Sequence, residues 1–323
     1  HHCIFVFLHI IHIIIVIMSI GESIYSTTIN KSTFFRNLQI WPLNDTLNYK
    51  GWLNNFSDAE EKEIACHILD FFIFYPRNMI NEMLRKVIGH VGYIFKSHFP
   101  DWKYEDFKDR CLYSFIPGET INPTDSGHTY VRKLRNSLDI PENRIVDNKL
   151  LYQILEKYTN LPIIFVDDFV GSGAQCDKAW NENRGGTHSY TLKDMSLIYG
   201  HKFVYAPLVV NHIGYERIKR KCLGLEVVTN HILDEQYNLF KPKCICWKGN
   251  SDLYRKGVDL IIRKSKEQGI PFSGGHNVLD VKGFGEQGLA LAFDDDGVPD
   301  AIPPIFYWCS DTWTPLIKKA YQR

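Results

Sequence analysis

The sequence predicts an α/β fold, with a mainly parallel sheet flanked by helices and an N-terminal helical cap. After residue 99, short apolar runs alternate with helical stretches, which is typical of a parallel sheet covered on both faces. Residues 51–99 have helical periodicity instead. The composition, 45% hydrophobic and 23% charged, is that of a globular chain with a substantial core. A length of 323 residues suits one large domain or two modest ones.

The helical cap is predicted from two periodic segments. Residues 57–60 have the Ser-x-x-Glu form of a capping box, and apolar residues follow at three- and four-residue steps until Pro76. A second periodic run over 79–95 predicts a second helix. We therefore expect a helical hairpin over 51–99. The domain division that we expect is a helical region over 18–99 and an α/β domain over 100–323.

Residues 3–20 form an almost wholly apolar run that is just long enough to cross a bilayer. The chain begins with His1, its first Lys or Arg is Lys31, and Met18 stands near the end of the run. A signal peptide or an oriented span would carry basic residues before or beside this run. We favour Met18 as the start of a cytoplasmic protein, with residues 1–17 as non-native upstream sequence. The alternative is a membrane anchor formed by residues 3–20.

Charge and cysteine content limit the partners and the compartment. The 37 basic and 37 acidic side chains balance, so no bulk charge attracts nucleic acid or an anionic membrane. A basic helical run over 217–221 could still hold a nucleic-acid backbone, and this is the alternative that we keep.

Eight scattered cysteines indicate a reducing compartment. Cys244 and Cys246 are interpreted as buried thiols in a strand, with a metal site including His231 and His212 as the alternative.

The elements expected after residue 99 include strands over 112–116, 163–166, 203–210 and 225–229, and helices over 129–136, 150–158, 176–180, 215–222 and 254–268. The C-terminal part is expected to contain two edge strands, over 288–293 and 305–308. Between them, residues 294–297 include three aspartates. We interpret these as a solvated turn, with a metal cluster as the alternative.

One stretch carries a chemical signature, because it predicts a strand, an acid pair, a glycine loop and a helix in succession. The apolar residues 163–166 are followed by Asp167 and Asp168, and a Gly-Ser-Gly turn over 171–173 leads into a helix expected to begin near Gln175. In open α/β sheets, ligands bind at the carboxyl ends of strands. The stretch therefore predicts a binding site.

The glycine loop is suited to hold a phosphate. Gly171 and Gly173 allow backbone N–H groups to point at one place, and a helix N-terminus adds partial positive charge. Ser172 adds a hydroxyl donor. The loop lacks the lysine of a Walker A motif, and Cys176 replaces the last glycine of a Rossmann fingerprint.

The acid pair next to an anion site indicates a sugar. Carboxylates repel a phosphate unless they bind something else beside it. Asp167 and Asp168 could accept hydrogen bonds from vicinal ribose hydroxyls while the loop holds the 5′-phosphate. One carboxylate could also stabilise positive charge that develops at C1′. Asp167 and Asp168 are thus the predicted catalytic residues.

Residues 166–175, Val-Asp-Asp-Phe-Val-Gly-Ser-Gly-Ala-Gln, resemble the PRPP-binding motif of type I phosphoribosyltransferases. The resemblance implies that Asp167 and Asp168 bind the ribose hydroxyls and that Mg²⁺ is bound through the ligand's pyrophosphate and hydroxyls. It assigns the 5′-phosphate to Gly171, Ser172, Gly173, Ala174 and Gln175. These enzymes usually end the loop with Thr, so Gln175 is a departure from the pattern.

Four further segments, over 117–119, 125–127, 303–308 and 313–316, resemble the phosphoribosyltransferase-like (PRTase-CE) proteins of bacterial conflict systems. The resemblance implies a phosphoribosyltransferase-type sheet that binds PRPP or a nucleotide, with glycosyl transfer or cleavage at ribose C1′. It also implies an effector of anti-phage defence with a partner protein. The alternative is a non-catalytic nucleotide or PRPP sensor, or a regulatory subunit, of the same fold.

A second candidate segment is Asp125, Ser126 and Gly127, which begins a predicted helix that carries Arg132. Helix capping alone accounts for these residue types. The functional alternative is that the N–H groups of this segment and Arg132 hold the ligand's pyrophosphate, as the resemblance suggests.

Overall fold

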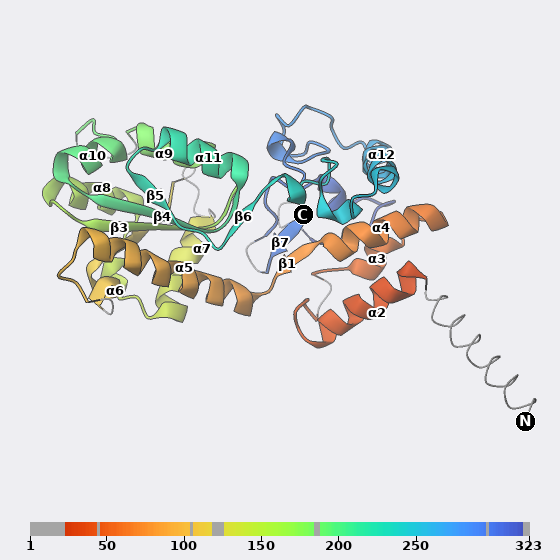
Figure 1. Ribbon diagram of the computed structural model, residues 1–323, viewed down its shortest axis with the longest axis horizontal. Coiled ribbons are helices and arrows are strands. Elements are labelled where there is room, and N and C mark those ends of the chain that lie inside the picture. Colours follow the sequence, from red (N-terminus) through yellow and green to blue (C-terminus); the bar gives the residue numbers. More distant parts are fainter. Residues whose placement is uncertain are drawn as a thin grey trace, which may run out of the picture.

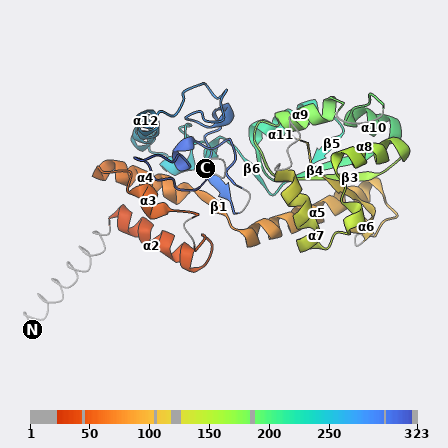
Figure 2. The ribbon, with the colours of Figure 1, turned by 180° about the vertical axis from the view of Figure 1, so that it is seen from behind.

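The computed structural model describes residues 23–43, 46–103, 106–117, 126–183, 188–294 and 297–318. These residues form two lobes side by side (Figure 1), and the view from behind shows the same division (Figure 2). We call residues 77–233 the sheet lobe. Residues 23–75 and 234–318 together make the mixed lobe. The predicted α/β class with parallel strands flanked by helices is confirmed.

The sheet lobe is built on five parallel strands. The order is β2-β3-β4-β5, and β6 pairs with the far end of β4. The bounds are β2 (Leu112–Ser114), β3 (Pro162–Val170), β4 (Lys202–Asn211), β5 (Leu225–Val227) and β6 (His231–Leu233). Strands β3 and β4 are buried almost throughout, as parallel strands covered on both faces require. Their apolar runs are the reason why the sequence predicted them.

Helices cover both faces of this sheet (Figure 1). On one face, α5 (Arg77–His98) packs on β4 and α7 (Ser126–Leu138) packs on β3. The other face is covered by α8 (Asn148–Lys157), α9 (Ala174–Asn181), α10 (Leu192–Tyr199) and α11 (His212–Lys221). The short α6 (Phe107–Arg110) and η2 (Glu142–Arg144) lie in connections. Because strand side chains alternate, Ile164 and Val166 join one core, and Ile163 and Phe165 join the other.

The mixed lobe gathers the two ends of the described chain around a parallel pair of strands, β1 (Ile73–Tyr75) and β7 (Leu291–Phe293). Its helices are α2 (Ile24–Asn37), α3 (Tyr49–Leu53), α4 (Ala59–Phe71) and α12 (Ser251–Glu267), with 3-10 turns η3 (Glu235–Tyr237), η4 (Ile245–Trp247), η5 (Phe284–Glu286) and η6 (Pro304–Phe306).

Trp52 stacks on Phe306 with ring centroids 5.7 Å apart, and its indole N–H donates to the carbonyl of Ile305 over 3.1 Å. Aromatic packing thus joins the N-terminal and C-terminal segments.

The predicted helical hairpin is wrong, because strand β1 separates its two helices. Helix α4 packs on α2 and α12 in the mixed lobe, whereas α5 packs on β4 in the sheet lobe. The predicted capping box is also wrong. The cap of α4 is Asp58, whose carboxylate accepts from the N–H groups of Glu60 and Glu61.

The C-terminal edge strands are partly wrong. Residues 291–293 form the strand β7 as expected, but residues 304–306 form the buried 3-10 turn η6. Two consecutive prolines, Pro303 and Pro304, lack the N–H groups that a strand ladder needs. Cys244 and Cys246 have buried thiols as predicted, but they lie at η4 rather than in a strand.

Several predictions fall outside the described residues. These are the Met18 start, the apolar run over 3–20, residues 118 and 119 of the segment 117–119, the Asp125 cap, and Asp295 and Asp296 of the acidic turn. Over the described ranges, no helix combines the length and the hydropathy of a membrane span. The domain division at residue 99 stays a prediction.

Candidate ribose-phosphate site

Strand β3 carries the acid pair to the carboxyl edge of the sheet. The strand continues past the predicted 163–166 to Val170, because its pairing with β4 runs as far as Val170 and Val210. Asp167 and Asp168 therefore lie within the last part of the strand and are 7% and 9% exposed. Buried carboxylates need hydrogen-bond donors around them.

Asp167 is held by groups of the sheet itself. The hydroxyl of Tyr205, on β4, donates to Asp167 Oδ2 over 2.8 Å, and the N–H of Asp168 donates to Asp167 Oδ1 over 3.0 Å. Burial, followed by the nearby carboxylate of Asp167, raises the pKa of Tyr205 well above its ordinary value. The phenol therefore stays protonated and remains a donor to Asp167.

Asp168, the second acid of the pair, is also close to Tyr205. Its carboxylate contributes, less than that of Asp167, to the raised pKa of the Tyr205 phenol. The strict alternation of side chains ends near the acid pair, because Phe169 packs on the core of Ile164 and Val166, and Val170 joins the core of Ile163 and Phe165. The acid pair therefore lies where the strand becomes irregular, just before the glycine loop.

The predicted glycine loop and helix are confirmed. Gly173 adopts the left-handed conformation, with φ of +70°, and α9 begins at Ala174, whose N–H donates to Ser172 Oγ over 3.3 Å. A side chain at Gly173 would also approach the backbone of Gly214 in α11. A Cβ at Gly214 would in turn collide with the carbonyl oxygen of Gly171. The loop is therefore packed tightly against the first turn of α11.

Gln175 connects the loop to β2. Its amide Nε2 donates to the carbonyl oxygen of Ile116 over 3.1 Å. The side chain thus ties the first turn of α9 to the segment that follows β2. The hydroxyl that Thr would supply at this position in the enzymes that the loop resembles is replaced by a link within the protein.

Three helices begin at this same edge of the sheet, because α7, α9 and α11 each follow one of the neighbouring parallel strands β2, β3 and β4. The start of α7 packs on the end of β2, since a Cβ at Gly127 would meet the ring of Phe115. Asn211 caps α11 by accepting from the N–H of Ile213 over 3.0 Å. Helix N-termini favour anions, so this edge is suited to a phosphorylated ligand.

The second predicted segment is placed only in part. Ser126 begins α7, in agreement with the predicted helix start, while Asp125 lies outside the described residues. Arg132 is exposed on the second turn of that helix. Its contact with a pyrophosphate stays a prediction.

Gln287 was missed by the sequence analysis, although it lies against the glycine loop. It follows η5 in the mixed lobe, is 2% exposed, and its amide lies beside Gly171. The surrounding stretch, Gly283-Phe284-Gly285-Glu286-Gln287-Gly288, has three glycines in six residues. Such a density of glycine was the available signal of a special backbone conformation.

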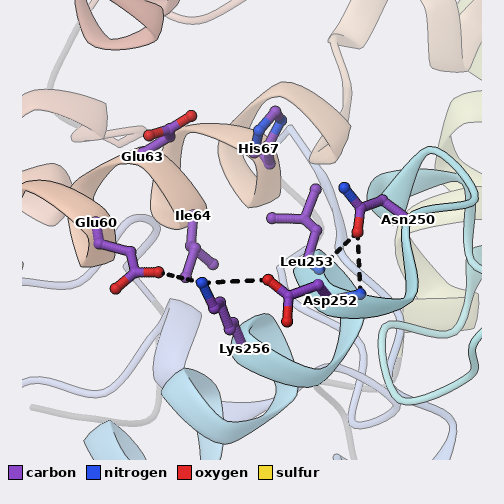
Figure 3. A pocket seen from close by; sticks show the side chains of 8 residues that line it. All are labelled: Glu60, Glu63, Ile64, His67, Asn250, Asp252, Leu253 and Lys256. Atoms are coloured by element: carbon purple, nitrogen blue, oxygen red, sulfur yellow. Dashed lines mark hydrogen bonds and ion pairs between the residues drawn. The ribbon is translucent and has the colours of Figure 1, made fainter.

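A separate pocket of about 260 Å³ lies between α4 and α12, at a distance in sequence from every predicted site residue (Figure 3). Three of its polar side chains form ion pairs with one another. Lys256 Nζ lies 2.6 Å from Glu60 Oε1 and 3.2 Å from Asp252 Oδ2. His67 also lines it, and burial, followed by the charge of Lys248, lowers the pKa of that imidazole. None of the predicted catalytic or ligand-binding residues lines this pocket.

A parallel sheet whose strand β3 carries an acid pair near its carboxyl end, followed by a glycine loop and a helix, defines a phosphoribosyltransferase-like protein. The model of the PRTase-CE family matches residues 49–319, and the chain belongs to that family. The matched residues span both lobes. No curated protein and no solved structure matches the chain.

Proposed function

We propose that the chain binds a ribose 5-phosphate group, as part of PRPP or of a nucleotide, at the carboxyl edge of β3. The observation that carries the proposal is the tight turn over 171–173, which leads from the buried acid pair directly into the N-terminus of α9. The backbone N–H groups from Gly171 to Gln175 would hold the phosphate, with Ser172 as a further donor.

The two carboxylates would have different roles in binding. Asp167 already accepts from Tyr205 and from the backbone of Asp168, so its main effect is to fix the end of β3. Asp168 would accept from the ribose hydroxyls and stabilise positive charge at C1′. Oxygen ligands suit Mg²⁺, and Asp168 is the side chain that would share such an ion with the ligand's pyrophosphate. The ion would neutralise charge on that leaving group.

The proposed reaction is glycosyl transfer or cleavage at C1′. The bond from C1′ to the leaving oxygen or base nitrogen breaks, and its electron pair stays on the leaving group. A lone pair of an acceptor base, or of water, forms the new bond to C1′, and the acceptor's proton passes to solvent. The protein supplies orientation and electrostatic stabilisation of the charged transition state.

A second candidate is a non-catalytic sensor or regulatory subunit that binds the same ligand. It is favoured by Gln175, whose amide is bonded to Ile116 and takes the place of a phosphate-binding hydroxyl. By the same family resemblance, we propose a cytoplasmic effector of anti-phage defence that acts with a partner protein. Incubation with a nucleotide pool, followed by mass spectrometry, separates turnover from binding alone.

The binding proposal is tested by titration calorimetry in Mg²⁺, with PRPP and with nucleoside monophosphates. Wild type should release or absorb heat, and Asp168→Asn should lose it. Asp259→Asn, on the exposed face of α12, is the matched control and should bind as wild type does. No heat with wild type, or equal heat with Asp168→Asn, would contradict the proposed site.

A further inference from the structure

Gln287 is a buried amide with an unused acceptor. Its Nε2 donates to the carbonyl oxygen of Phe284 over 3.1 Å. A carbonyl can only accept, so the amide nitrogen must face Phe284 and Oε1 must face the other way. Within the described part of the chain, Oε1 has no hydrogen-bond partner. Buried acceptors without a donor are uncommon in folded proteins.

The unused oxygen lies at the glycine loop. A Cβ built on Gly171 would be 3.1 Å from Gln287 Nε2, 3.3 Å from Gln287 Oε1 and 3.4 Å from the ring of Phe169. The amide therefore occupies the space that a side chain at position 171 would take. It comes from the mixed lobe and reaches the first residue of the loop in the sheet lobe.

The backbone around Gln287 is fixed by hydrogen bonds on several sides. The N–H of Gly288 donates to Lys282, the N–H of Gly285 donates to Gly275, and the side chain of Asn238 donates to the carbonyl of Glu286. Glu286 has φ of +52°, a conformation that glycine adopts more readily than glutamate. Strain of this kind persists where the surroundings determine it, and it is concentrated at functional sites.

We propose that Gln287 is a ligand-binding residue whose Oε1 accepts a hydrogen bond from a ribose hydroxyl of the molecule bound at the glycine loop. This inference rests on the proposed function. An ionised phosphate has no hydrogen to donate, whereas the ribose is bonded to that phosphate and carries hydroxyl donors. The site is then formed by both lobes, with Asp168 and the loop on one side and Gln287 on the other.

The test compares Gln287→Met with wild type. Methionine fills a similar volume and has no amide oxygen. Binding of ribose 5-phosphate and of its 2-deoxy and 3-deoxy analogues is measured by calorimetry in Mg²⁺. We expect wild type to prefer ribose 5-phosphate, and Gln287→Met to bind it about tenfold more weakly, as for loss of one buried hydrogen bond. The variant should also discriminate less against one of the two deoxy sugars. Gln236→Met, at an exposed amide on η3, is the control.

The outcomes separate this inference from the proposed function. If wild type binds no ribose phosphate, the proposed function fails, and the role of Gln287 fails with it. If wild type binds, and Gln287→Met binds each of the three sugars as tightly as wild type does or binds all three more weakly by one common factor, only the role of Gln287 is overturned. Should Gln287→Met not fold in a thermal unfolding scan, Gln287→Asn draws the amide back by one methylene and should show the same reduced discrimination.

Discussion

Gly173 and Gly214 are in backbone contact, since a Cβ built on Gly173 would be 2.8 Å from the carbonyl oxygen of Gly214. The contact joins the loop after β3 to the first turn of α11. Because both residues are glycine, the two helices that follow β3 and β4 can begin close together. The shape of the proposed phosphate loop therefore depends on a residue that is about forty positions away in sequence and outside the loop motif.

Gly214→Ala should distort the glycine loop. Its new methyl group would meet the carbonyl of Gly171, and overpacking of this kind costs about 1–3 kcal/mol. Gly249→Ala is the matched control, because Gly249 has φ of +71° but nothing within 4 Å of its Cβ position. The control should lose only about 1 kcal/mol of stability, through backbone strain. Urea unfolding measures the loss of stability in both variants. A loss in Gly214→Ala that is equal to or smaller than the loss in Gly249→Ala would argue against the close contact.

Tyr205→Phe should destabilise the protein by about 1–3 kcal/mol, because it removes a donor to the buried carboxylate of Asp167. Tyr113→Phe, on the adjacent strand β2, is the matched control. The Tyr113 hydroxyl is also buried but has no hydrogen-bond partner among the described residues, so its removal should be neutral or stabilising. The free energies of unfolding of the two variants decide the matter. Equal losses of unfolding free energy would mean that the hydrogen bond to Asp167 adds no more stability than the Tyr113 hydroxyl does.

Gln175→Thr should change binding and stability in opposite directions. The substitution removes the hydrogen bond to Ile116, at a cost of about 0.5–1.5 kcal/mol. It also restores the hydroxyl that resembles the usual end of the phosphate loop, so binding of ribose 5-phosphate should tighten several-fold. Calorimetry and thermal unfolding measure the two effects. Weaker binding would indicate that the Gln175 side chain itself holds the ligand.

Stability should fall as the pH drops below the ordinary histidine pKa of 6.5, because His201 is fully buried. Its Nδ1 accepts from the N–H of Leu161 over 3.1 Å, and its Nε2 lies 2.9 Å from the carbonyl oxygen of Leu155. Protonation of Nδ1 would remove this acceptor and would bring its new hydrogen against the hydrogen of the Leu161 N–H.

Burial lowers the pKa of His201 in the folded state, while the bond to Leu155 raises it by less. A lowered folded pKa means that the stabilising contribution is complete above the unfolded pKa and is lost as the pH falls below it. The loss has a limiting slope of about 1.4 kcal/mol per pH unit. Urea unfolding from about pH 7.5 to about pH 5.5 should show a steeper decline for wild type than for His201→Gln. Parallel curves would contradict the prediction.

The sequence was sufficient to predict the elements whose signals are local. The four apolar residues before Asp167 predict strand β3, and the Gly-Ser-Gly turn predicts the start of α9, because both depend on neighbours within a few positions. The same holds for β4 and for the helix that begins at Ser126. These elements contain most of the predicted site.

The relationships that were missed are between distant residues. The three-residue strand β1 exists because Ile73 pairs with Leu291 near the other end of the chain, and no local pattern specifies that partner. The bond from Tyr205 to Asp167 depends on the register between two strands. Gln287 reaches Gly171 only because the two lobes pack together. A pattern of residue types cannot indicate which of two adjacent acids accepts from a tyrosine of the next strand, or which amide faces a loop.

The pairing of β1 with β7 also has a consequence for the order in which the chain is completed on the ribosome. All five strands of the sheet lobe lie between these two in the sequence, so that lobe can form its hydrogen bonds while β7 is still untranslated. During that interval β1 has an open edge, which is a site for pairing with other chains. A nascent chain halted before residue 291 should therefore contain a protected sheet and a protease-sensitive segment around residues 59–75.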